Sequence, residues 1–131
     1  MRGILNILED SAAVGAICGD RIYVNKIPEG VDKLPCVWIE RQGRPFVGYT
    51  SSGASDLDMI DHRVVSTATT ALEADSLGDA VRAALEAKAA GVYDTETFAG
   101  VDFIDDDTSV FSASDKNIHL VEQIYTVWKR L

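Results

Sequence analysis

The chain has 131 residues, 47% of them hydrophobic and 25% charged, which is typical of one globular domain with a single core and excludes disordered and fibrous classes. Twelve basic and twenty-one acidic residues give a net charge of −9, and the segment from Asp94 to Asp115 holds seven carboxylates but no Lys or Arg. This balance excludes phosphate binding in that segment, and we expect it to repel DNA.

The first eighteen residues predict two short helices. Apolar side chains recur there at helical spacing, and the second helix has Asp10 or Ser11 as its N-cap. Gly19 follows at the position where a helix commonly ends.

Extended structure is predicted after these helices. Residues 21–27 and 34–41 are rich in β-branched and aromatic side chains, and we expect both to be extended. Residues 42–58 are rich in Gly, Ser and Pro, which indicates a long surface loop or a hairpin tip. Residues 59–70 alternate well enough to predict a strand.

An amphipathic helix is the clearest element of the sequence. Its apolar positions follow the i, i+3, i+4, i+7, i+8 pattern: Leu77, Ala80, Val81, Ala84 and Leu85. Asp75 or Ser76 can cap its N-terminus, and Gly91 is placed to end it. Gly78 inside the helix costs about 1 kcal/mol relative to Ala, so we expect a close approach of the helix to a sheet there.

The last third of the chain predicts further strands. Residues 101–104 and 109–111 are short apolar runs on either side of Asp105, Asp106 and Asp107, which we expect to form a polar, solvated turn. Residues 117–129 give the longest strand signal and are apolar on both faces. Such a strand either lies centrally in a sheet or presents one face to another subunit.

Together these elements predict an α+β fold in one domain spanning residues 1–131. We expect a mostly antiparallel sheet of about four to five strands, with one long amphipathic helix and the short N-terminal helices packed on one face. The order contains no series of βα units and no internal repeat.

The sequence offers little chemistry. His62 and His119 fall inside predicted strands, and neither a G-x-S-x-G turn nor a G-K-[ST] loop occurs. The three consecutive aspartates lack the spacing of a calcium loop. Cys18 and Cys36 are interpreted as small core residues. We therefore predict no catalytic residue, no metal and no cofactor. No stretch has the length of a membrane helix, and we expect a soluble cytosolic chain.

An ordered set of short motifs resembles the tail-completion, or tail terminator, family of long-tailed bacteriophages. The motifs follow one another over nearly the whole chain: Gly19-Asp20-Arg21-Ile22-Tyr23, Pro28, Leu34-Pro35-Cys36-Val37, His62-Arg63-Val64-Val65 and a helix over 72–90. The resemblance implies a structural virion protein, not an enzyme, whose subunits form a ring, usually a hexamer, at the head-proximal end of the tail tube. Such a ring halts tube polymerisation and gives the neck its docking surface, and relatives occur in prophages and gene-transfer agents.

The resemblance also implies the partners. They are further copies of the chain, the tail-tube protein and a head-tail connector or neck protein, while DNA passes through without being held and no membrane is involved. Assembly would take place in the host cytoplasm. As interface residues we predict Arg21 and Arg44 as cations that bridge to a neighbour's acidic segment at Asp105, Asp106 and Asp107, and Phe46 and Tyr49 as loop anchors.

Three other readings remain open. A neck or head-completion connector subunit would bind portal or head components instead of tail tubes. A monomeric α+β module that binds another protein is a different class, and a small hydrolase using Asp105, Asp107 or His119 is a third class and the least favoured.

Overall fold

A computed structural model describes residues 2–25, 34–41, 49–50, 53–54, 57–86, 90–113 and 116–130. The helices are α1 (Arg2–Glu9), α2 (Ala12–Cys18) and α3 (Ala71–Glu86). The strands are β1 (Ile22–Val24), β2 (Cys36–Arg41), β3 (Tyr49–Thr50), β4 (Gly53–Ala54), β5 (Leu57–Ala68), β6 (Gly91–Tyr93), β7 (Glu96–Ala113) and β8 (Lys116–Arg130).

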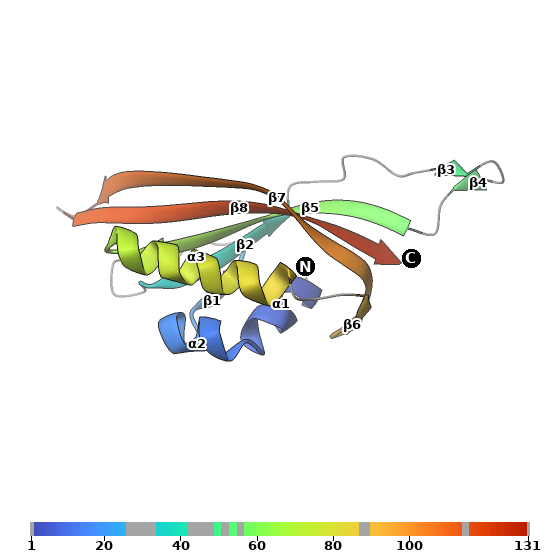
Figure 1. The fold of residues 1–131 in the computed structure, drawn as a ribbon, viewed down its shortest axis with the longest axis horizontal. Coiled ribbons are helices and arrows are strands. Elements are labelled where there is room, and N and C mark those ends of the chain that lie inside the picture. Colours follow the sequence, from blue (N-terminus) through green and yellow to red (C-terminus); the bar gives the residue numbers. More distant parts are fainter. Residues whose placement is uncertain are drawn as a thin grey trace.

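These elements form two layers, with the three helices on one face of a twisted sheet (Figure 1). The sheet has six strands in the order β1-β2-β5-β8-β7-β6. All neighbours are antiparallel except β1 and β2, which are parallel. The α+β class, the mostly antiparallel sheet and the helices on one face are confirmed. The predicted strand number was too low, because β6 is only three residues long and has no sequence pattern of its own.

The N-terminal helices form where the sequence predicts them. The Ser11 side chain caps α2 by accepting a hydrogen bond from the Val14 N–H at 3.3 Å. Gly19 ends α2 with φ 62° and ψ −130°, a backbone conformation that side chains disfavour. Its N–H donates to the Gly15 carbonyl at 2.9 Å.

The main core fills the space between the helices and the sheet. The fourteen buried members of this core are Ile4, Ile7, Leu8, Val14, Cys18, Val37, Ile39, Val64, Leu77, Val81, Leu85, Phe98, Tyr125 and Val127. A smaller cluster of Cys36, Trp38, Val65 and Leu120 lies on the other face of the sheet. Both cysteines are free and buried, as predicted.

Helix α3 begins earlier than the sequence predicts. Its first residue is Ala71, and the Thr70 hydroxyl accepts a hydrogen bond from the Glu73 N–H at 3.2 Å, so neither Asp75 nor Ser76 caps it. The close approach at Gly78 is confirmed: a Cβ at this position would lie 2.9 Å from Val121 Cγ1.

The predicted turn at Asp105, Asp106 and Asp107 is wrong. These residues lie within β7, opposite Ile124, Gln123 and Glu122 of β8. Bulges between Phe98 and Gly100 and between Phe103 and Asp105 let the strand bend without ending. Aspartate has a low strand propensity, but pairing with β8 overrides it here.

Strand β8 lies centrally, between β5 and β7, which accounts for its two apolar faces. In the segment 42–58, β3 and β4 pair in a separate two-stranded sheet, consistent with a hairpin tip. The remaining residues of that segment before β5 lie outside the described part of the chain.

Candidate functional site

The side of the sheet that faces away from the helices is strongly acidic. Strand register places the following side chains on it: Cys36, Trp38, Glu40, Asp61, Arg63, Val65, Thr67, Asp102, Asp105, Asp107, Leu120, Glu122, Ile124, Thr126 and Trp128. We call this set the helix-free face, since no helix of the described residues covers it. Six carboxylates and one arginine leave it a net charge of −5 (one minus six).

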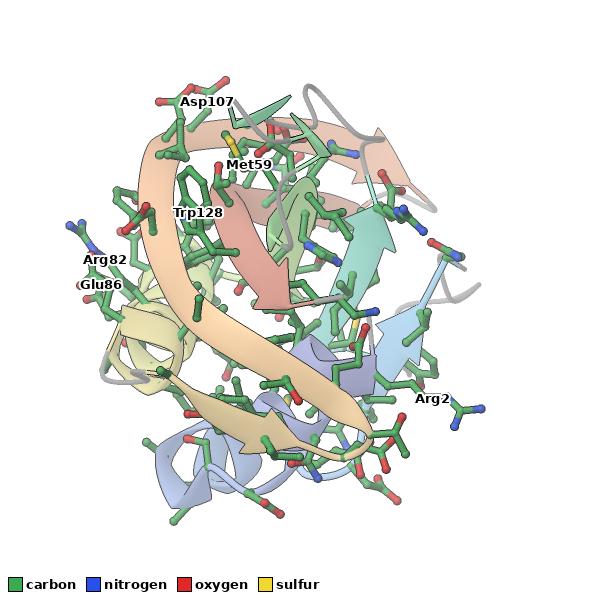
Figure 2. All side chains as sticks on the ribbon, turned by 90° about the vertical axis from the view of Figure 1, so that its right-hand side faces the viewer. Arg2, Met59, Arg82, Glu86, Asp107 and Trp128 are labelled. Carbon is green, nitrogen blue, oxygen red and sulfur yellow. The ribbon has the colours of Figure 1, made fainter. Side chains whose placement is uncertain are left out.

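Figure 2 shows this side of the molecule from the end of the sheet, with Asp107, Met59 and Trp128 gathered away from the helices. The sequence indicated only part of this face. Asp61 and Glu122 carry no signal of their own, because each is the only carboxylate of its predicted strand, residues 59–70 and 117–129. Strict alternation along β5 and β8 is the signal that would have found them.

Polar contacts hold the side chains of this face in place. Arg63 donates to Glu40 at 3.0 Å and to Glu122, bridging β2, β5 and β8. Partial burial opposes the charge on Arg63, yet the hydrogen bonds to Glu122 and Glu40 raise its pKa. Both terminal nitrogens of Arg63 are therefore already paired within the chain.

Two further hydrogen bonds hold one carboxylate of β5 and one carboxylate of β7 in place on this face. The Thr126 hydroxyl donates to Asp61 at 2.6 Å, and the Trp128 indole N–H donates to Asp102 at 2.8 Å. Each bond joins neighbouring strands through side chains, so the face is ordered and its charge is held in fixed positions.

Strand β7 forms the edge of the sheet beyond the short stretch that pairs with β6. The Asp105 carboxylate accepts a hydrogen bond from the Asp106 N–H at 2.8 Å, and the Asp107 carboxylate accepts one from the Thr108 N–H at 2.9 Å. Edge-strand N–H groups that would otherwise be free are thereby satisfied locally. Asp105, Asp106 and Asp107 are all exposed.

Arg21 lies at the opposite edge of the sheet from β7, immediately before β1. Its Nε donates to the Pro35 carbonyl at 2.8 Å, and the residue is half-buried. The structure thus places Arg21 and the three aspartates at different edges of one protomer, so they do not form one site within the chain.

The other predicted interface residues are not placed in detail. Arg44 and Phe46 lie outside the described residues. Tyr49 begins β3 and pairs with Ala54, but its side chain is not among those described.

His62 is one of the buried polar residues that face the helices. It is 1% exposed, and neither ring nitrogen has a hydrogen-bond partner of good geometry. Burial lowers the pKa of His62 to about 4, against a small opposing effect of the nearby Ile60 carbonyl. The ring is therefore neutral at pH 7 and acts as part of the core.

Glu96 ties the start of β7 to the start of α1. Its carboxylate accepts hydrogen bonds from the Gly3 N–H at 2.6 Å and from Lys129 Nζ at 2.7 Å. Partial burial raises the pKa of Glu96, but the bonds from Lys129 and Gly3 outweigh it and lower the value to about 2.

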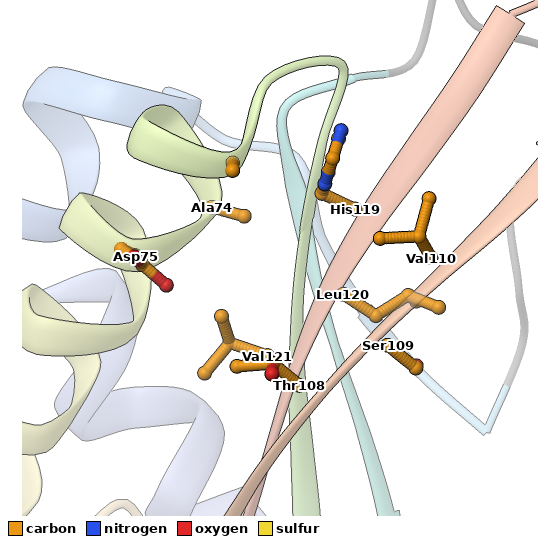
Figure 3. Close-up of a pocket in the computed structure, with 9 residues that line it drawn as sticks. Ala74, Asp75, Thr108, Ser109, Val110, His119, Leu120 and Val121 are labelled. Carbon is orange, nitrogen blue, oxygen red and sulfur yellow. The ribbon is translucent and has the colours of Figure 1, made fainter.

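A notch opens between the N-terminal end of α3 and the distal part of the β7–β8 hairpin (Figure 3). Its volume is about 270 Å³, and its lining includes Ala74, Asp75, Val110, His119 and Val121. The lining is mostly apolar, and nothing in the notch resembles a catalytic pair in hydrogen-bonding contact.

Within the described part of the chain, no group of three or more His, Cys, Asp or Glu residues is arranged to hold a metal ion. The helices described there include none that is both long and apolar enough to cross a membrane.

The chain is similar to a known protein family and to a solved structure. Residues 2–128 match the family model described as Tail completion protein gp17. No curated protein matches the chain significantly. Among solved structures, the chain is similar to one described as "Virion of native gene transfer agent (GTA) particle", with 16% sequence identity and a TM-score of 0.66. The similarity covers 98% of this chain and 92% of that chain, and at this identity it shows a shared fold.

Proposed function

Because the chain belongs to the family of tail completion protein gp17, we propose that it is a structural subunit of a virion tail. In this proposal, copies of the chain form a ring, a hexamer, at the head-proximal end of the tail tube. The ring ends tube polymerisation and provides the docking surface for a connector or neck protein. The observation that carries the proposal is the family match over residues 2–128, almost the whole of the described fold.

The charge of the helix-free face supports a channel role. A ring through which DNA passes needs an inner wall that does not bind phosphate, and a wall of like charge meets this need. The helix-free face carries a net charge of −5 in the isolated chain, of which −3 comes from groups other than Asp105 and Asp107, and its one arginine is already paired with two carboxylates. We therefore propose that this face lines the channel and that DNA passes without specific contact.

The interface residues stay part of the same proposal. Arg21 is half-buried, and among the described residues only its Nε is bonded, to the Pro35 carbonyl, so its terminal nitrogens can reach a neighbour. Exposed carboxylates at Asp105, Asp106 and Asp107 form a fitting partner surface. Arg44, Phe46 and Tyr49 are proposed as further contacts on sequence grounds. The role is structural and non-enzymatic, with no cofactor.

Tube-length control tests this function directly. Purified chain is added to polymerising tail-tube protein, and tube lengths and ends are measured by electron microscopy. We expect tubes that stop growing and carry the chain at one end only. Unchanged tube growth, with binding to portal or head components instead, would favour a neck connector. A chain that stays monomeric and binds neither would leave the binding-module reading.

A further inference from the structure

The exposed apolar residues of this chain gather on the edges of its sheet. Among the described residues, five large hydrophobic side chains are exposed. Four of them lie on edge strands: Val24 on β1, Val92 on β6, and Ile104 and Val110 on β7. Monomeric proteins usually keep sheet edges short, polar or covered, so apolar side chains on both outer edges call for a partner.

The two outer edges also differ in charge. The β7 edge carries Asp102, Asp105, Asp106 and Asp107, and no ion pair to any of them occurs within the described residues. On the helix side of this strand, Arg82 stacks 3.9 Å from the centre of the Phe103 ring and is already paired with Glu86. Closely spaced like charges on one strand repel one another, and a cationic partner would relieve that repulsion.

Arginines gather at the β1 edge instead. Arg41 ends β2, two residues beyond the Ile39 that pairs with Val24; it is exposed and has no ion pair among the described residues. Arg21 directly precedes β1, with Asp20 as the neighbouring carboxylate in the chain.

We propose that the β1 edge of one copy docks on the β7 edge of the next, with Val24 packing near Ile104 and the arginines facing Asp105, Asp106 and Asp107. This inference rests on the proposed ring. A contact between two different surfaces on opposite sides of a protomer is heterologous, and repeating it closes a ring when the successive rotations complete a full turn. If the helix-free faces line a channel, the edges of each sheet are the parts that meet the neighbours.

Side chains, not backbone ladders, make this contact. The outward N–H groups of Asp106 and Thr108 are already bonded to the carboxylates of Asp105 and Asp107. Addition of a strand at this edge would have to break both bonds. Charge pairing and apolar packing leave them intact and set the direction of association.

Thiol cross-linking tests the pairing of edges. The native Cys18 and Cys36 are 0% exposed, so Val24→Cys and Ile104→Cys would provide the only accessible thiols among the described residues. The two single variants are treated with a short bismaleimide separately and as a mixture, in the presence of tail-tube protein. We expect cross-linked dimers in the mixture only, and a ladder ending at the ring size for the double variant. Leu72→Cys, exposed on α3, replaces Ile104→Cys in the control mixture and should give no product.

Charge reversal tests the electrostatic part. Arg41→Glu or Asp106→Lys alone should lower the cross-linking rate roughly 2- to 5-fold at low salt, and the two together should restore it. Asp79→Lys on α3 is the matched control and should have no effect. Unchanged rates in both single reversals would overturn the pairing of these charges.

The remaining outcomes separate the two proposals. A ring in light scattering without a Val24–Ile104 cross-link overturns the edge contact and leaves the ring standing. Products from either single variant alone mean a two-fold contact and overturn the head-to-tail arrangement. Absence of any oligomer, with or without tubes, overturns the ring and the edge contact together.

Discussion

His62 is held neutral inside the core, and this has a consequence for stability in acid. Its pKa is lowered from 6.5 to about 4 by burial, so between these values the unfolded chain binds a proton that the folded chain does not. Stability should therefore fall as the pH drops from 6.5 towards 4, by about 3 kcal/mol at full effect. His62→Leu should remove this fall without loss of stability at pH 7, as measured by urea unfolding across the pH range.

A substitution on the same strand provides the control for this prediction. Ser66→Ala changes a buried residue of β5 that does not titrate in this range and should leave the pH dependence of unfolding as it is in the unaltered chain. If His62→Leu kept the same decline between pH 6.5 and 4, the buried imidazole would not be its source.

At the scale of single residues, the sequence predicted burial well and partners poorly. Both cysteines and both histidines lie where strand and helix patterns place them. The contacts of Glu96 with Gly3 and Lys129 could not be predicted, because they join residues far apart in the chain. Such a contact forms only in the folded chain, and the composition of either segment does not indicate it.

Two glycines in helices allow a direct test of how α3 meets the sheet. Gly78→Ala should lower stability by about 1 to 3 kcal/mol, because the added Cβ would lie 2.9 Å from Val121 Cγ1 in a filled core. Gly15→Ala in α2 has nothing within 4 Å of the new Cβ and should stabilise by roughly 0.5 to 1 kcal/mol. Thermal unfolding of both variants checks the pair, and equal effects would contradict the close packing at Gly78.

The Glu96 carboxylate should hold α1 against the β6–β7 hairpin. Glu96→Gln is expected to lose about 1 to 2 kcal/mol at pH 7, since it breaks the ion pair with Lys129 and weakens the bond from Gly3. The folded-state pKa of about 2 lies below the ordinary 4.5, so this contribution is present above pH 4.5 and is lost as the pH falls towards 2.

Glu9→Gln, which changes an exposed carboxyl on the same helix, is the control for that prediction. Hydrogen exchange should report faster opening of α1 in Glu96→Gln alone. Similar exchange in the two variants would show that the carboxylate does not anchor the helix.

At the scale of elements, the helices and β8 were predictable, and β7 was not. Helical spacing and alternation are local, and they placed α1, α2, α3 and β8 within a few residues. Three consecutive aspartates favour a turn locally, whereas in the fold they lie along an edge strand paired with β8. Aspartate is tolerated there because an edge is open to water and its side chains can bond to free N–H groups.

For the whole molecule, the acidic face and the sheet edges were hidden from the sequence. Glu40, Asp61 and Glu122 come from three strands, and only the sheet brings them onto one side. The family resemblance, by contrast, could be read from the ordered motifs, and the match over residues 2–128 confirms it.

Salt should act on the assembled ring through the charges at its subunit contacts. If arginines at the β1 edge face aspartates at the β7 edge, raising the ionic strength should weaken association. The distance over which exposed charges attract one another is about 8 to 10 Å at physiological salt and becomes shorter as salt is added. Sedimentation at increasing salt should show the ring dissociate to smaller species. Association that strengthens with salt would instead indicate a contact dominated by apolar surface.

The central claim is a ring at the end of the tail tube with the helix-free face turned inward. Cryo-electron microscopy of the chain bound to tail tubes tests it most directly. We predict a closed ring at one end of each tube, with β5 and β8 forming the channel wall and Glu40, Asp61 and Glu122 facing the channel. Helices on the channel side, with these carboxylates on the outer rim, or chains scattered along the tube wall, would contradict the account.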